Sequence, residues 1–418
     1  MVVNCGHCRQ RPRLLAAASA TVLLMLLAPV APASTLSSES SVGLSSEYAS
    51  NPFMQASGAH SAESEAILAD IPATYANDSQ SLELDPKVRW AKTQGQLALL
   101  SDYQYLDGIW NFASDRNQLT SDIGWHRDST LYNVFENVSL QGLDLRRREE
   151  LATVGWKRYL SEISDLQLSG SYDQVDYSHN SSLSLDNYRY ELAQIEYDCT
   201  LSERLQWTAA MGYARYLLRD SAYTSDNRFV QSSLVWAQSE TWSATTQVGY
   251  SRLSATQQSD ICCAIRLGPN GYFLQFLAIK QSASSGTYNY SLDFEHTGER
   301  AKFGFTASRS IQPSGFGALL IEDDLAIKAS YPWTERWALS ATLRGAQQSD
   351  SLQALGVLSR RFYGLDLGAT WAWTEHWTLS LESSYAWQRV SQVSVTNPTS
   401  RGVTAIVTLS RQFGRLRL

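Results

Sequence analysis

The feature of the sequence that most constrains its fold is a long strand pattern repeated around short turns. Residues 331–348 read YPWTERWALSATLRGAQQ, and residues 371–388 read WAWTEHWTLSLESSYAWQ, so both contain W-T-E-x-W-x-L-S. After each turn, apolar and aromatic residues alternate with small and polar residues. A period of two puts the two kinds of residue on opposite faces of a β-strand. The pattern predicts long strands with one apolar and one polar face.

The same alternation continues through residues 88–413, and no window there shows a sustained helical period. We expect strands at 148–160, 163–177, 188–200, 204–218, 228–239, 242–254, 286–297, 301–312, 319–333, 337–349, 362–374, 377–389 and 401–413. Residues 88–145 should add strands at 95–104, 107–114 and 118–127. The expected total is about 16, with 14 and 18 as alternatives, because a bacterial outer-membrane barrel needs an even number of strands.

Short turns that carry a glutamate separate these runs, at Glu162, Glu203, Glu240, Glu299, Glu335 and Glu375. Four of their five spacings are 36–41 residues, and the fifth, of 59, contains an enlarged loop. A soluble propeller also has a period of about 40, but its blades contain four short strands each. The runs here are long enough for tilted bilayer spans of about 9–11 residues. Tryptophans gather near the turns, as in the aromatic girdles of membrane barrels. We therefore expect an all-β, transmembrane antiparallel up-and-down β-barrel rather than a propeller or a sandwich.

The first 33 residues have the organisation of a secretory signal peptide. A basic region at 9–13 precedes an apolar run at 14–28, and Ala31-Pro32-Ala33 fits the small-x-small cleavage pattern. The alternative is a membrane anchor, but the run is shorter than the roughly 20 residues a spanning helix needs. We expect cleavage near Ala33. Residues 34–87, rich in Ser, Ala and acids, are expected to be a largely flexible leader. The alternative within it is a first strand at 65–75, although Pro72 argues against a central strand. Residues 88–413 then form the barrel, and residues 414–418 form a tail.

Several function classes are disfavoured by the sequence. The net charge of −7 argues against nucleic acid as a partner, because proteins bind the phosphates of nucleic acids mainly through Lys and Arg side chains. The chain has no glycine-rich phosphate loop and no two-His metal spacing. Its histidines lie scattered, and serine is too abundant for the sequence to indicate a catalytic triad. We predict no enzyme, and no catalytic, cofactor-binding or metal-ligating residues.

The barrel interior is the most informative place to look for functional residues. In a membrane barrel the polar face of each strand points inward. The alternation puts a set of charged residues there, which we predict to line the pore: Asp293, Glu295, Asp324, Lys328, Arg344, Asp366 and Glu382. They could simply pair with one another and hydrate the wall. Alternatively, because acids outnumber bases, they could favour cations or neutral sugars. A barrel of about 16 strands leaves an aqueous channel.

Parts of the chain resemble a known family. The segments at 309–340 (RSIQPSGFGALLIEDDLAIKASYPWTERWALS), 124–132 (GWHRDSTLY) and 48–54 (YASNPFM) resemble the β-barrel porin family of Gram-negative outer membranes. IVTLSRQF at 406–413 resembles the terminal strand that barrel-assembly machinery reads, with Phe413 as the closing aromatic. Arg411 and the tail after Phe413 depart from that pattern. The resemblance implies an outer-membrane pore, associated in some members with exopolysaccharide secretion.

The leading hypothesis is therefore an outer-membrane pore or export conduit for exopolysaccharide or small solutes. Its expected partners are outer-membrane lipids, the barrel-assembly machinery and polysaccharide-export components. The second hypothesis is a non-conducting barrel with an assembly or adhesion role through its extracellular loops. Its contact surface would be the enlarged loop at 256–285, which we expect to extend as its own hairpin.

The first testable prediction concerns topology. The glutamate-bearing turns should face the periplasm and the 256–285 loop the cell exterior, because periplasmic turns are short in outer-membrane barrels. On intact cells, a membrane-impermeant thiol reagent should label a Gly268→Cys variant and not a Thr334→Cys variant. Both variants need Cys199→Ser, Cys262→Ser and Cys263→Ser to remove native labelling. The opposite result would mean an inverted topology.

Overall fold

The computed structural model describes residues 34–95, 102–130, 144–178, 185–219, 222–268, 271–315, 319–351, 359–391, 399–414 and 416–417. The expected signal peptide lies outside the described residues. The strands are β1 (Thr35–Ser38), β2 (Ser41–Ala49), β3 (Ala62–Asp70), β4 (Ala73–Ala76), β5 (Gln80–Gly95), β6 (Tyr103–Ala113), β7 (Asn117–Ser129), β8 (Arg146–Tyr159), β9 (Ser164–Tyr177), β10 (Tyr188–Ser202), β11 (Leu205–Leu218), β12 (Ala222–Ala237), β13 (Trp242–Gly268), β14 (Gly271–Thr297), β15 (Lys302–Pro313), β16 (Leu319–Pro332), β17 (Trp337–Asp350), β18 (Ser359–Ala372), β19 (Trp377–Ser391), β20 (Thr399–Gln412) and β21 (Leu416–Arg417). Over these residues, no helix has the length and apolar character to cross a membrane.

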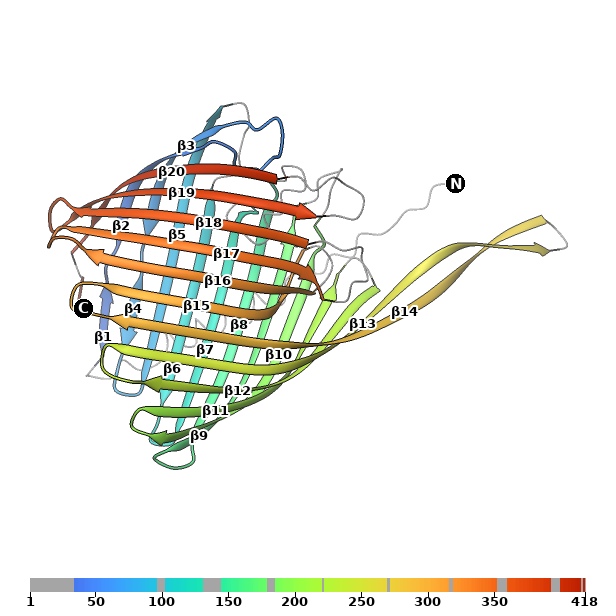
Figure 1. The fold of residues 1–418 in the computed structure, drawn as a ribbon, viewed down its shortest axis with the longest axis horizontal. Helices are drawn as coiled ribbons and strands as arrows, with labels where there is room; N and C mark the ends of the chain where they lie inside the picture. Colours follow the sequence, from blue (N-terminus) through green and yellow to red (C-terminus); the bar gives the residue numbers. More distant parts are fainter. Residues whose placement is uncertain are drawn as a thin grey trace.

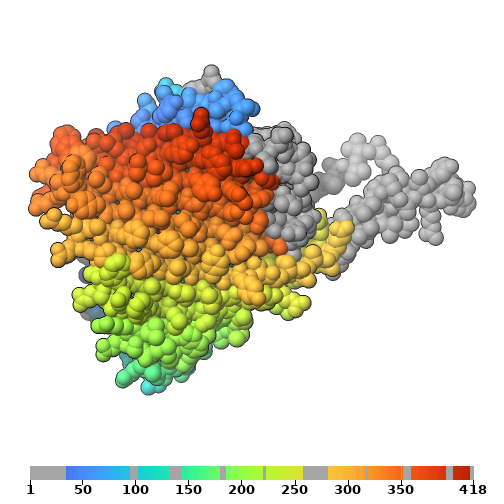
Figure 2. Space-filling view, in the orientation of Figure 1, coloured from blue at the N-terminus to red at the C-terminus, as the bar shows by residue number. Residues whose placement is uncertain are grey.

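Eighteen of these strands form one closed antiparallel barrel (Figure 1). Strands that follow one another along the chain pair side by side, and β2 then pairs with β20 from Ser41↔Gln412 to Ala49↔Thr404. The N-terminal and C-terminal strands also lie beside each other in the space-filling view (Figure 2). The short strands β1, β4 and β21 pair at one end of the barrel, β1 with both of the others. Closure leaves no unpaired edge in the wall.

The strands expected after residue 145 are confirmed, with ends shifted by a few residues except where β12, β13 and β14 are longer. The observed barrel of 18 strands has two more than the expected total of about 16 and matches the larger of the two alternatives, 14 and 18. The expected strands at 107–114 and 118–127 fall in β6 and β7. Most of the strand expected at 95–104 lies outside the described residues, between the end of β5 at Gly95 and the start of β6 at Tyr103.

The expectation of a flexible leader at residues 34–87 is also wrong. This segment forms β1 to β4 and the first half of β5, and β2 and β3 are full members of the wall. We interpreted the high Ser and Glu content of this segment as a sign of flexibility, but these residues are also common on the interior face of a barrel strand. Glu47, for example, accepts a hydrogen bond from Arg89 at 2.7 Å. The chain after Phe413 is likewise more than a tail, since β21 pairs with β1.

The repeated W-T-E-x-W motif has a local physical cause. In one copy the Thr334 hydroxyl accepts hydrogen bonds from the backbone N–H groups of Arg336 and Trp337, at 3.2 and 3.0 Å. Thr374 does the same in the other copy, at 3.2 and 3.1 Å. A threonine that receives these N–H groups stabilises the tight turn between two strands. All the short turns lie at one end of the barrel (Figure 1).

At the other end, β13 and β14 continue past the barrel rim as a two-stranded ribbon (Figure 1). They pair with each other from Trp242↔His296 to Gly268↔Gly271. The pairing of β13 with β12 stops at Gln258, and that of β14 with β15 begins at Tyr290. The expectation that the enlarged loop extends as its own hairpin is confirmed.

The two faces of the wall differ in composition. Directly paired residues share a face, and the register puts exposed apolar residues such as Val248, Leu343 and Val407 together on one of them. The opposite face is the interior, because its side chains reach segments across the barrel. The Tyr216 hydroxyl of β11, for instance, donates to the Ser314 carbonyl after β15 at 2.6 Å. Outer apolar residues therefore alternate with inner polar ones around the barrel.

The closing strand also shows why Arg411 is accommodated. Its guanidinium lies 5.7 Å from the ring centre of Trp377 and 5.4 Å from that of Phe413, which are cation–π distances. The Phe413 N–H donates to the Ser40 carbonyl at 2.9 Å, which continues the β20–β2 pairing by one residue.

Closure by β2 yields the second prediction. Deleting residues 41–49 should abolish the heat-modifiable folded band in a gel, because β3 and β20 run in the same direction and cannot replace the antiparallel pairing. As a control, residues 259–280 of the ribbon should be replaceable by a short turn with the band retained, since they pair only with each other. A folded band after the 41–49 deletion would contradict the essential role of β2.

Candidate functional site

The candidate site is the interior wall formed by β14 to β19. The strand register puts every charged residue expected to line the pore on the interior face. They come from five strands: Asp293 and Glu295 from β14, Asp324 and Lys328 from β16, Arg344 from β17, Asp366 from β18 and Glu382 from β19. Because each strand presents every second residue inward, the register alone brings these side chains to one wall.

Part of this wall is neutralised by pairing. The Arg344 guanidinium of β17 donates to Asp324 at 2.7 Å. It also lies 3.7 Å from Glu322, a buried acid on β16, the strand of Asp324. Gln348 donates a further hydrogen bond to Glu322 at 3.0 Å. For these residues, charge pairing explains the composition of the wall.

Other charged side chains of this wall are exposed, and the structure describes no ion pair for them. Glu295, Lys328, Asp366 and Glu382 are exposed, although they belong to the interior face of a closed barrel. Among the described residues, no basic group makes an ion pair with Asp293 or with any of these three acids. Water must therefore reach this part of the interior, because an unpaired charge is otherwise too costly to bury.

Two of the open acids share a cavity of about 360 Å³. Asp366 and Glu382 line it together with the hydroxyl residues Thr342, Ser384 and Thr404. Carboxylates with neighbouring hydroxyls can hold a hydrated cation or accept hydrogen bonds from a sugar, because both groups are hydrogen-bond acceptors.

The opposite wall, formed by β5 to β9, contains a polar network that sequence reasoning missed. His126 lies 2.8 Å from Asp107 and 2.9 Å from Glu149, and Arg147 contacts Glu149 and Asp128. The alternation of Asp122, His126 and Asp128 with apolar residues was visible in the sequence. It was overlooked because Asp107 and Glu149 come from the neighbouring strands β6 and β8, and the sequence alone does not give their register with β7.

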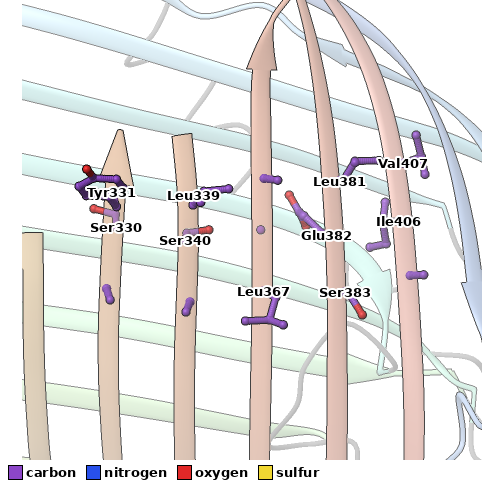
Figure 3. A pocket seen from close by; sticks show the side chains of 15 residues that line it. Ser330, Tyr331, Leu339, Ser340, Leu367, Leu381, Glu382, Ser383, Ile406 and Val407 are labelled. Atoms are coloured by element: carbon purple, nitrogen blue, oxygen red, sulfur yellow. The ribbon is translucent and has the colours of Figure 1, made fainter. Parts of the chain in front are cut away.

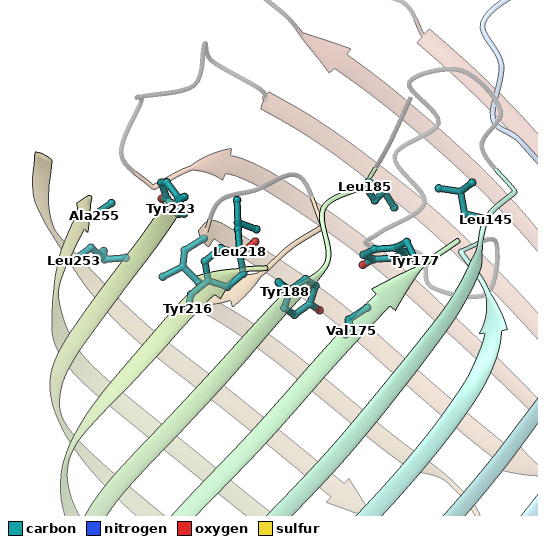
Figure 4. Packing of buried hydrophobic residues seen from close by; sticks show 11 residues of the cluster. Leu145, Val175, Tyr177, Leu185, Tyr188, Tyr216, Leu218, Tyr223, Leu253 and Ala255 are labelled. Carbon is teal, nitrogen blue, oxygen red and sulfur yellow. The ribbon is translucent and has the colours of Figure 1, made fainter. Parts of the chain in front are cut away.

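The ribbon end of the interior contains a buried apolar cluster (Figure 4). Tyr188 and Tyr216 of the wall have ring centres 5.5 Å apart. The segment after β15 packs on them, since Ser314 accepts the Tyr216 hydrogen bond and the Gly315 carbonyl accepts one from the Asp186 N–H at 2.7 Å. A Cβ at Gly315 would lie 2.8 Å from the Tyr177 hydroxyl, so the close packing suits only glycine. The segment after β15 is therefore packed against the inner side of β9 to β11 at this end.

A larger hollow, of about 640 Å³, involves the outer surface of β16 to β20 (Figure 3). Its lining is mainly apolar and includes Tyr331, Leu339, Leu381 and Val407, which the register puts on the outer face. The apolar, outer-face part of this lining suits lipid contact, whereas Ser340 and Glu382, which also line the smaller cavity, belong to the interior face.

The described residues hold no group of three or more His, Cys, Asp or Glu side chains able to bind a metal ion.

Comparisons with known proteins identify relatives by shape only. No family model matches the chain, and no curated protein matches it. Similar solved structures include OccAB2 of Acinetobacter baumannii, at 12% identity, 91% coverage of this chain, 98% of that chain and a TM-score of 0.45. OpdK of Pseudomonas aeruginosa has 12% identity, coverages of 91% and 99% and a TM-score of 0.44. The ferric-catecholate import receptor Fiu of E. coli K12 has 7% identity, coverages of 92% and 82% and a TM-score of 0.45. Likeness at this level says nothing about function, and the fold rests on the strand pairing.

The two faces of β19 give the third prediction. Leu381 is on the outer face and Glu382 on the inner face (Figure 3). In a bilayer, an arginine on the outer face near the midplane costs roughly 2–4 kcal/mol. Leu381→Arg should therefore reduce the folded fraction in a heat-modifiability gel far more than Glu382→Arg. Equal losses from the two variants would rule out this assignment of faces.

Proposed function

We propose that the protein is an outer-membrane pore that passes small solutes with a weak preference for cations. The observation that carries this proposal is the set of exposed charges on the interior of a closed barrel: Glu295, Lys328, Asp366 and Glu382. Side chains of this kind require a water-filled space inside the wall. Barrels of 16 to 18 strands leave an aqueous channel, whereas smaller ones fill with side chains.

The outer surface supports a membrane location. Large apolar side chains are exposed around the outer face, and Trp333 and Trp373 are 63% and 54% exposed beside the short turns. A soluble monomer rarely exposes a continuous apolar surface, whereas a bilayer covers one. Tryptophan at the turn end suits the level of lipid head groups. We place the barrel in the Gram-negative outer membrane, reached after cleavage near Ala33 and insertion by the barrel-assembly machinery.

Transport explains the interior better than catalysis does. The cavity beside Asp366 and Glu382 offers only carboxylates and hydroxyls among its polar side chains. A carboxylate field in an aqueous path raises the local concentration of cations without any chemical step. We therefore assign the protein no enzymatic role.

Two finer questions depend on the apolar cluster at Tyr188 and Tyr216. If this cluster closes the path, the protein is the non-conducting barrel of the second hypothesis, with the β13–β14 ribbon as its contact surface. If the path stays open, neutral sugars can also enter, and an exopolysaccharide remains the cargo that the family resemblance implies. Planar-bilayer recordings separate the two, and block of the current by an oligosaccharide would support the sugar cargo.

The fourth prediction concerns ion selectivity. The wild-type pore should show a weak cation preference in its reversal potential across a salt gradient. The preference should fade in concentrated salt, because the screening length falls from about 10 Å at 0.1 M to about 3 Å at 1 M. Asp366→Asn with Glu382→Gln should lower the preference without unfolding the barrel, since these acids lack ion-pair partners among the described residues.

A matched control changes two acids on the outer face. Asp226 and Asp323 pair with outer-face arginines. Asp226→Asn with Asp323→Asn removes the same charge but should leave the reversal potential unchanged. Anion selectivity of the wild type, or an equal effect of the two double variants, would contradict the proposed role of the interior acids. A wild type that gives no conductance steps would contradict the pore itself.

A further inference from the structure

Three pairs of arginines lie directly opposite each other across neighbouring strands on the outer face of the barrel. The pairs are Arg127↔Arg148 on β7 and β8, Arg228↔Arg252 on β12 and β13, and Arg361↔Arg389 on β18 and β19. All six residues are exposed. We call these six residues the outer arginine belt.

Such pairs are unfavourable on their own. Like charges placed directly opposite each other destabilise a sheet. Some belt members have local partners, since Arg148 pairs with Glu150 and Arg361 donates to Gln347 at 3.1 Å. In the part of the chain that the structure describes, Arg228, Arg252 and Arg389 make no hydrogen bond or ion pair. An anion supplied from outside the protein would relieve the repulsion.

The belt has a defined level on the barrel. Arg252 lies ten residues along β13 from Trp242, and Arg361 lies ten residues along β18 from Trp371. With a rise of about 3.3 Å per residue and a tilt of about 40°, ten residues span about 25 Å of bilayer, the height of the apolar band of such barrels. The belt is therefore at the head-group level opposite the short turns, on the side from which the ribbon extends.

The residues below the belt are suited to acyl chains. On β13, Val248 and Tyr250 lie between Trp242 and Arg252 on the outer face, 59% and 44% exposed. On β18, Tyr363 and Leu367 occupy the same place, 53% and 50% exposed. An occupant of this surface must combine anionic groups at the level of the belt with apolar chains that run along the wall.

We propose that the outer arginine belt binds the phosphate groups of a bisphosphorylated glycolipid of the lipid A type in the outer leaflet. The proposal rests on the proposed function, because it requires a barrel in the outer membrane with its short turns in the periplasm. A guanidinium offers two parallel N–H donors to a phosphate, which makes arginine better suited than lysine to this contact. Two facing guanidinium groups can hold one phosphate between them.

Two arginines at the other end of the barrel, Arg204 and Arg411, have partners within the protein. Arg411 lies over the rings of Trp377 and Phe413, and the Arg204 guanidinium donates to the Gln238 carbonyl at 3.2 Å. The facing pairs are therefore a particular property of the belt end.

The test measures binding of fluorescent bisphosphorylated lipid A to the purified full chain in detergent. The variant Arg228→Gln, Arg252→Gln, Arg361→Gln, Arg389→Gln should bind it at least roughly tenfold more weakly, the loss expected when one hydrogen bond to a charged group disappears. Dephosphorylated lipid A should bind the wild type no better than it binds the variant. Phosphatidylglycerol should bind more weakly than lipid A and be less affected by the variant.

The control replaces Arg204 and Arg411 with Gln at the opposite end and should leave lipid A binding unchanged. If the fourfold variant does not fold, the variant Arg228→Gln, Arg252→Gln alone provides the same comparison at one pair. Equal lipid A binding by wild type and a folded belt variant would overturn the proposal, and so would phosphatidylglycerol binding with the same affinity and the same loss.

Conductance separates this proposal from the proposed function. The belt is on the outer face, so a folded belt variant should conduct as the wild type does. A wild type without conductance but with belt-dependent lipid A binding would refute the pore and leave the lipid site standing. Normal conductance with belt-independent lipid binding would refute only the lipid site.

Discussion

The structure depends on the pairing of β2 with β20. A strand edge in a bilayer would expose N–H and C=O groups to hydrocarbon, which offers them no hydrogen-bond partners. The register from Ser41↔Gln412 to Ala49↔Thr404 removes this edge. The rest of the wall follows from this closure, because the strand count, the direction of each strand and the assignment of inner and outer face must all be consistent around the ring.

Because the barrel is closed, each strand has one face toward the interior and one toward the exterior. Several charged side chains of the interior face form ion pairs on one wall, whereas others, on the opposite wall, have no ion-pair partner among the described residues. On β5 to β9, His126 and Arg147 pair with Asp107, Asp128 and Glu149 at 2.5–3.4 Å. On β14 to β19, Asp366 and Glu382 remain exposed. The charges of the His126 network on β5 to β9 are paired, whereas in the proposed pore the unpaired acids on β14 to β19 would supply the field that an ion meets. An asymmetric lumen of this kind explains why only a weak selectivity is expected.

The strands and their inner faces could be predicted from the sequence where a clear alternation of apolar and polar residues was bounded by recognisable turns. From residue 146 onward, the glutamate-bearing turns set the register, and alternation then put Asp366 and Glu382 on the interior face. Residues 34–87 were misread because Glu47 and its neighbouring serines match the composition of a flexible segment, although Glu47 pairs inside the barrel with Arg89. The contact of Tyr216 with Ser314 could not be predicted, because it joins segments that only the closed barrel brings together.

Alternation also lets one strand serve two chemistries. On β18, Arg361 lies on the outer face and Asp366 on the inner face, five residues apart. Their environments are separated by a single sheet, so an anionic head group at one and a cation at the other do not compete for the same space. Because neighbouring positions point to opposite faces, a substitution at either residue should act on one of these properties alone. Under the two proposals, lipid contact and solute passage would therefore depend on different residues of the same strand.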